Sequence, residues 1–177
     1  VHREKGRTLV RVFRPHDVNV WIRTTIGYEP MSRIHANGIF EWRGEFPPEM
    51  PYRLRIEAKG DTQSVYETYD AYAFPLQISD HDVYLFNEGK LRQAYRMLGA
   101  QRVRNSGVDG VRFSVWAPNA GRVSVVGDFN RWDGRIHPMA VHHASGVWEL
   151  FIPDLPPNAV YKYEIRNRDS GEIVLKT

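Results

Sequence analysis

The amino-acid sequence states nearly the same pattern twice. The segment His35–Trp42 returns as His143–Leu150, and Tyr52–Ile56 returns as Tyr161–Ile165. The offset grows only from 108 to 109 residues (143 − 35 and 161 − 52), which one inserted residue explains. Solenoid and propeller units have shorter periods, roughly 20–50 residues. The repeat therefore predicts tandem copies of one small domain.

Both copies are expected to be rich in β-strands. Segments in which apolar and polar residues alternate are typical of half-buried strands. Such segments lie at 9–14, 18–22 and 52–56 in the first copy, and at 111–116, 122–126, 147–152 and 161–165 in the second. Turn-forming pairs such as Pro118-Asn119 and Ser170-Gly171 separate them. The pattern predicts an all-β protein made of two tandem immunoglobulin-like β-sandwiches.

The stretch between the copies has a different pattern. Ser79 followed by Asp82 resembles a helix N-cap, and residues 87–97 place Leu91, Ala94 and Tyr95 on one face of a short helix closed by Gly99. We therefore expect a first sandwich at residues 1–72, a helical linker at 73–104 and a second sandwich at 105–177. Since Val1 leads almost directly into a strand, the first sandwich is expected to be truncated at its start.

Composition excludes several classes of function. The chain has 24 basic and 21 acidic residues and no basic run, so no nucleic-acid partner is expected. It contains no cysteine, which excludes disulfides and thiolate metal sites and fits a reducing cytoplasm. No apolar stretch approaches the roughly 18 residues of a membrane span, so we expect a soluble protein without a membrane partner.

The two copies differ most at Gly127–Gly134, which has no equivalent in the first copy. Trp132 supplies a flat apolar ring there, and Asn130 offers both a donor and an acceptor. Lys162 alternates with two tyrosines on a strand, so its ammonium points to the opposite face and could add a second donor. A ring beside such donors suits a sugar. A tryptophan in a sandwich is more often part of the core, the role expected of Trp116 and Trp148.

Several of these segments resemble the family 48 carbohydrate-binding module. The resemblance is carried by Val115–Ala120, Val125–Asp133, Gly146–Ile152 and Tyr161–Glu164, and the linker segments Asp82–Gly89 and Leu98–Ala100 are similar to those of bacterial 1,4-α-glucan (glycogen) branching enzymes. The resemblance implies that α-1,4-glucan or glycogen binds at Trp132 and Lys162, with Asn130 as a hydroxyl partner. Some glycogen-binding modules have a second tryptophan in the last hairpin, where this chain has Glu172–Leu175.

The same resemblance places the family's chemistry in a carboxyl-terminal (β/α)8 barrel, which needs at least about 200 residues. The chain is then a non-catalytic amino-terminal fragment that docks glucan and packs on that barrel, in a cytoplasmic enzyme that transfers α-1,4-glucan chains to form α-1,6 branches. No catalytic residue, metal or cofactor is expected in it.

Other interpretations are weaker. Asp128 and Asp133 flank the Trp132 turn, but five residues of one turn do not form a cleft between two catalytic carboxyls. His142 and His143 are adjacent on a strand and face opposite sides, so with His137 they do not predict a metal site. Two other functions stay open: a stand-alone or regulatory glycogen-binding module, and a sandwich that serves protein–protein interaction only.

Overall fold

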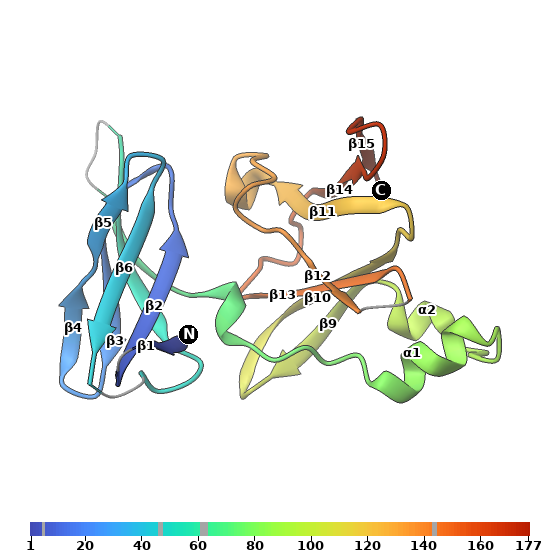
Figure 1. The fold of residues 1–177 in the computed structure, drawn as a ribbon, viewed down its shortest axis with the longest axis horizontal. Coiled ribbons are helices and arrows are strands. Elements are labelled where there is room, and N and C mark those ends of the chain that lie inside the picture. Colours follow the sequence, from blue (N-terminus) through green and yellow to red (C-terminus); the bar gives the residue numbers. More distant parts are fainter. Residues whose placement is uncertain (5, 46–47, 61–63, 143–144) are drawn as a thin grey trace. The chain divides into compact units, whose positions relative to one another are not determined.

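The computed structural model describes residues 1–4, 6–45, 48–60, 64–142 and 145–177 (Figure 1). The chain forms two compact units, Val1–Phe74 and Pro75–Thr177. In each unit two antiparallel sheets pack their apolar faces together, and helices are confined to short segments. The predicted fold class, two all-β sandwiches with a short helical linker, is confirmed.

The first unit contains two four-stranded sheets. One has the order β1-β2-β6-β5 and the other the order β4-β3-β7-β8. The strands are β1 (His2–Glu4), β2 (Arg7–Phe13), β3 (Asp17–Thr24), β4 (Gly27–Pro30), β5 (Ser32–His35), β6 (Ile39–Gly44), β7 (Arg53–Ala58) and β8 (Val65–Tyr69), followed by the 3-10 turn η1 (Ala71–Ala73). The core between the sheets includes Val10, Ile22 and Leu54, each fully buried.

The second unit repeats this plan. A four-stranded sheet of order β12-β13-β10-β9 faces a three-stranded sheet of order β11-β14-β15. Its strands are β9 (Gly99–Asn105), β10 (Val108–Trp116), β11 (Ala120–Gly127), β12 (Ala140–His142), β13 (Val147–Pro153), β14 (Tyr161–Asn167) and β15 (Ile173–Lys176), with the 3-10 turn η2 (Asp128–Asn130) after β11. Phe113, Val123, Val125 and Tyr163 form part of the core, and Trp148 is buried as predicted.

Individual hydrogen bonds also repeat between the two units. Arg14 N donates to Gly38 O at 2.7 Å, and the corresponding Ala117 N donates to Gly146 O at 2.8 Å. Both glycines have positive φ angles, 92° and 72°, and a Cβ atom on either would lie 2.4 or 2.5 Å from a proline Cα. Any side chain would clash at these positions. The sequence repeat therefore reflects the same close contact between two turns in each sandwich.

The helical linker differs in detail from the prediction. Helix α1 (Asp80–Asn87) starts as expected, because the Ser79 hydroxyl accepts a hydrogen bond from Asp82 N at 3.1 Å. The predicted helix at 87–97 is wrong: α1 ends at Asn87, and only α2 (Ala94–Met97) is helical beyond it. Gly89 has a φ of 66°, which reverses the chain after α1. The segment predicted as linker, 73–104, also contains most of β9.

A buried carboxylate attaches the linker to the second sandwich. Glu149 on β13 is fully buried, and it accepts hydrogen bonds from Gln77 N at 2.7 Å and from Ile78 N at 3.2 Å. His142 Nε2 lies 2.8 Å from its second oxygen. Ile78 and Met97 then pack with Val147 on the outer face of the sheet, where Figure 1 shows α1 and α2 beside β9 and β10. The linker is therefore packed against the sandwich. None of the described helices is long and apolar enough to cross a membrane.

Candidate functional site

The turn Gly127–Gly134 begins where β11 ends. Arg131 and Trp132 follow η2 with φ angles of 56° and 59°, so two consecutive non-glycine residues adopt the left-handed conformation. Trp132 N donates to Gly127 O at 2.9 Å, and Asp133 N donates to Asn130 O at 3.1 Å. These hydrogen bonds hold a backbone conformation that residues other than glycine rarely adopt. A strained backbone fixed in this way is a common feature of ligand-binding sites.

The ring of Trp132 is partly exposed and fixed in place. Trp132 as a residue is 40% exposed, and its Nε1 donates to Asp128 Oδ1 at 2.8 Å. Because the indole N–H is already bonded, the exposed surface of the ring is apolar. The ring can therefore contact the C–H face of a flat ligand without losing a hydrogen bond.

Asn130 lies beneath this turn and is only 3% exposed. Its Oδ1 accepts from Gly127 N at 2.9 Å, its Nδ2 donates to Val125 O at 2.8 Å, and His137 Nδ1 lies 2.9 Å from the same Nδ2. The amide predicted to meet a sugar hydroxyl is thus occupied by the protein itself. Asn130 shapes the turn and does not present its side chain to solvent. The sequence did not reveal this role, because the residues of the turn are the same whether the asparagine side chain points into the protein or out to solvent.

Lys162 lies on the sheet face that the turn covers. It is paired with Val126 on β11, and Glu164, two residues further along β14, shares its face. Gly134 approaches that face closely, since a Cβ atom there would lie 2.2 Å from Glu164 Oε1. Tyr163 points the other way into the core, as the alternation predicts. The structure therefore places Lys162 and the Trp132 turn on one face of the sheet, with Asn130 as their support.

The two aspartates of the turn are occupied with structural contacts. Asp128 binds the indole of Trp132, while both oxygens of Asp133 bind the guanidinium of Arg135, at 2.9 and 2.7 Å. Their separation and partners give no pair of carboxyls across a cleft. The histidines are similarly engaged, His137 near Asn130 and His142 near Glu149. His143 lies outside the described residues, and within the described part of the chain no group of acidic, histidine or cysteine side chains forms a metal site.

The first sandwich has a different arrangement at the corresponding place. There β3 and β4 are joined by a short turn, with Thr24 Oγ1 donating to Gly27 O at 3.0 Å. The repeat of Tyr52–Ile56 as Tyr161–Ile165 places Arg53 where the second sandwich has Lys162. Arg53 stacks on the ring of Tyr69 at 4.5 Å and donates to its hydroxyl at 2.9 Å. Arg53, which corresponds to Lys162, is therefore already engaged by Tyr69. The short turn between β3 and β4 has no equivalent of the Trp132 turn.

The prediction that Trp116 lies in the core is wrong. The residue was expected in the core because it ends an alternating strand, but it is 54% exposed. The alternation of β10 places it on the outer face with Ser114, and the linker covers that face only as far as Phe86, whose ring meets the Trp116 ring edge-on at 6.1 Å. Period-two alternation does not distinguish a core face from a face that a neighbouring segment covers in part.

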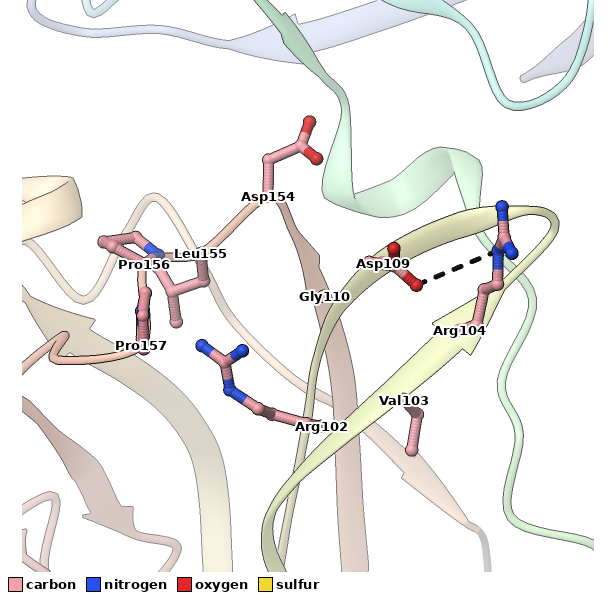
Figure 2. A pocket seen from close by; sticks show the side chains of 9 residues that line it. All are labelled: Arg102, Val103, Arg104, Asp109, Gly110, Asp154, Leu155, Pro156 and Pro157. Atoms are coloured by element: carbon pink, nitrogen blue, oxygen red, sulfur yellow. Dashed lines mark ion pairs between the residues drawn. The ribbon is translucent and has the colours of Figure 1, made fainter.

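A cavity of about 550 Å³ in the second unit lies between β9, β10 and the loop after β13. Figure 2 shows the guanidinium of Arg102 pointing toward Leu155 and Pro157, while Arg104 forms an ion pair with Asp109 at 3.8 Å. No aromatic residue lines this cavity. It therefore lacks the ring on which a sugar stacks, which the Trp132 turn has.

Two family models match the two parts of the chain. Residues 97–177 match the model of carbohydrate-binding module 48 (isoamylase N-terminal domain), and residues 1–72 match that of the alpha-1,4-glucan branching enzyme GlgB N-terminal domain. The chain is 63% identical over 99% of its length to 1,4-alpha-glucan branching enzyme GlgB of Nitrosospira multiformis, and 64% identical over 100% of its length to that of Nitrosomonas europaea.

The chain spans 24% of the length of each of these two relatives. Among solved structures, it is similar to pullulanase from Anoxybacillus sp. LM18-11 complexed with maltotriose, with 13% identity and a TM-score of 0.36 over 97% of this chain and 24% of that one. The two family matches and the identity along the whole chain lead to one conclusion: the chain belongs to the amino-terminal region of the 1,4-alpha-glucan branching enzyme family and includes its carbohydrate-binding module 48.

Proposed function

We propose that the second sandwich binds α-1,4-glucan, such as glycogen, at the Trp132 turn. The observation that carries this proposal is that Trp132 is 40% exposed while Asp128 holds its ring. A pyranose stacks its C–H face on such a ring, while its hydroxyls take hydrogen bonds from nearby donors. The ammonium of Lys162 is the donor on the same sheet face, and Asn130 keeps the turn in shape. The proposal uses Trp132 and Lys162 as contacts and Asn130 as their support.

The parent protein would be a 1,4-α-glucan branching enzyme, as the names of its relatives suggest. In this proposal it cleaves an α-1,4-glucan and transfers the fragment to form an α-1,6 branch, by chemistry located in a barrel outside this chain. The present part holds glucan and packs on that barrel without taking part in catalysis. The first sandwich (1–72) and the linker (73–104) then act as structural or chain-guiding parts, with 105–177 as the binding module. The absence of cysteine agrees with a cytoplasmic enzyme.

Affinity electrophoresis in gels that contain glycogen tests the binding proposal. The 177-residue protein should migrate more slowly as glycogen is added, and Trp132→Ala should lose most of that retardation. Trp132→Phe is the matched control, because it keeps a ring and should retain part of the binding. If the unsubstituted protein and Trp132→Ala migrate alike, and glycogen slows neither, the binding proposal is wrong.

The parent activity has its own test. The protein encoded by the intact gene should convert amylose into branched glucan, which lowers its iodine absorbance. The 177-residue chain alone should leave the absorbance unchanged. An active 177-residue chain would contradict the proposal that catalysis lies elsewhere.

A further inference from the structure

A second groove of the second sandwich contains an exposed tryptophan. It has a volume of about 300 Å³ and lies between the loop that joins β10 to β11 and the hairpin that joins β14 to β15. Its apolar surface comes from Trp116, Pro118, Ile165 and Val174. The volume is at the lower limit of the roughly 300–1,000 Å³ of small-molecule sites. The groove is therefore large enough for a small ligand.

The ring of Trp116 is fixed in the same way as that of Trp132. Its Nε1 donates to Ser145 O at 3.0 Å, and Phe86 supports one edge. With its N–H occupied and 54% of the residue exposed, Trp116 offers solvent an apolar ring that does not need to reorient. A ring held in this way loses little entropy when a flat ligand stacks on it.

The backbone around the groove is also held in place. Ala117 N donates to Gly146 O at 2.8 Å, and Arg168 N donates to Asn119 O at 3.0 Å, which joins the two loops. Asn167 N donates to Glu172 O at 2.8 Å and closes the hairpin. The groove is thus formed before any ligand arrives, as most small-molecule sites are.

The polar groups at the rim point to a neutral ligand. The Oδ1 of Asn167 accepts from Asp169 N and Ser170 N, which leaves its Nδ2 as a donor. The side chains of Asn119 and Glu172 have no hydrogen-bonding partner among the described residues. The lining contains one carboxylate and no cation, so an anionic ligand would be repelled. Amide and carboxylate groups around an apolar ring match the hydroxyls of a sugar.

We propose that this Trp116 groove is a second α-glucan subsite, separate from the Trp132 turn. The inference rests on the proposed function for its ligand class, although its residues are different. The two places lie at opposite ends of β11, which runs from Ala120 to Gly127. Seven residue steps of about 3.3 Å place these ends about 23 Å apart. Short maltooligosaccharides then occupy the subsites independently, whereas glycogen can engage both and gain avidity.

NMR titration of the 15N-labelled 177-residue protein tests the second subsite. Maltotriose should shift the Trp116 indole and the amides of Ala117 and Asn119, as well as the amides of Gly127–Gly134. In Trp132→Ala the turn should lose its response, while the dissociation constant read at the groove stays the same. Cellotriose, a β-linked control, should shift neither set.

Substitutions at the rim of the groove should weaken binding at the groove alone, and they leave the Trp116 ring in place. The double substitution Asn119→Ala and Glu172→Ala should weaken binding at the groove by about tenfold, since two hydrogen bonds of roughly 0.7 kcal/mol each are lost. Binding at the turn should not change. Asn158→Ala, at an exposed position that lines neither subsite, is the matched control.

Each other outcome has a distinct meaning. If maltotriose saturates the turn and leaves the groove amides in place, the second subsite is wrong and the proposed function stands. If only the groove responds, the Trp132 proposal fails and the second subsite stands. If the groove amides change with protein concentration and not with sugar, the groove is a protein-contact surface and the inference is overturned.

Discussion

At the scale of single residues, the most informative comparison is between tryptophans in the second sandwich. Trp148 is buried, while Trp116 and Trp132 are 54% and 40% exposed. Each exposed ring donates its N–H to a neighbouring oxygen, Ser145 O or Asp128 Oδ1. A ring whose only polar atom is satisfied at its edge can face solvent in one orientation. This shared feature is the basis of both proposed glucan contacts.

Asn130 gives a prediction at the same scale. Asn130→Ala removes a buried amide that serves Gly127 N and Val125 O, so both backbone groups lose a partner. We expect a loss of about 1–3 kcal/mol in the free energy of unfolding, together with weaker glycogen retardation. Urea unfolding measures the first effect and affinity electrophoresis the second. Asn158→Ala should change neither, and unaltered stability in Asn130→Ala would contradict the supporting role.

Glu41 gives a pH-dependent prediction. It is buried in the first sandwich, and hydrogen bonds from Arg43 (2.6 Å) and Arg11 (2.7 Å) hold its pKa below the usual range. A lowered pKa in the folded state adds stability above the unfolded-state pKa of about 4.3, and that stability is lost as the pH falls through the folded-state value. Glu41→Gln should therefore flatten the acid branch of the stability curve.

Urea unfolding of the first sandwich between about pH 7 and pH 3 measures this effect. The unsubstituted protein should lose more stability over that range than Glu41→Gln. Glu57→Gln, at a more exposed glutamate that accepts from Asn19, is the control. Parallel curves for the unsubstituted protein and Glu41→Gln would show that the two arginines do not stabilise the ionised form.

At the scale of elements, the equivalent glutamates of the repeat have different partners. Glu41 on β6 binds two arginine side chains, whereas Glu149 on β13 binds two backbone N–H groups of the linker. The repeat thus keeps a buried carboxylate and changes what it holds. In the second sandwich, this carboxylate determines where the linker begins to pack on the sheet.

Substitution of Glu149 should release the linker. Glu149→Ala leaves Gln77 N and Ile78 N without acceptors in a buried place, so we expect a loss of about 3 kcal/mol in unfolding free energy. Hydrogen exchange should become faster across α1 and α2 before it does so in β10 and β13. Glu149→Gln keeps one carbonyl acceptor and should recover part of the protection. Unchanged exchange in α1 would mean that apolar packing alone holds the linker.

The sequence predicted the strands well and two local features poorly. Alternation located β2, β10 and β14, because a strand with one buried face imposes a period of two. The helix expected at 87–97 ignored Gly89, whose positive φ angle ends α1. The outward position of Trp116 and the inward amide of Asn130 depend on contacts with residues distant in the chain, Phe86 and Val125. Neither contact can be recognised from the sequence pattern around Trp116 or Asn130.

At the scale of the whole molecule, the chain consists of two compact units, Val1–Phe74 and Pro75–Thr177. Because each unit has its own core, we expect two unfolding transitions in differential scanning calorimetry. Glu41→Gln should shift only the transition of the first unit, and Glu149→Ala only that of the second. A single transition that both substitutions shift alike would mean that the units unfold together.

The Glu149 contact also decides what can be cut out and moved. The match to carbohydrate-binding module 48 begins at residue 97. Glu149, which lies inside that module, accepts hydrogen bonds from Gln77 N and Ile78 N, which lie before it. A graft that starts at residue 97 would carry the buried side chain of Glu149 without two of its three contacts. A fusion of this module to another protein should therefore begin at about Pro75, so that the module keeps the two backbone N–H groups that bind its buried carboxylate.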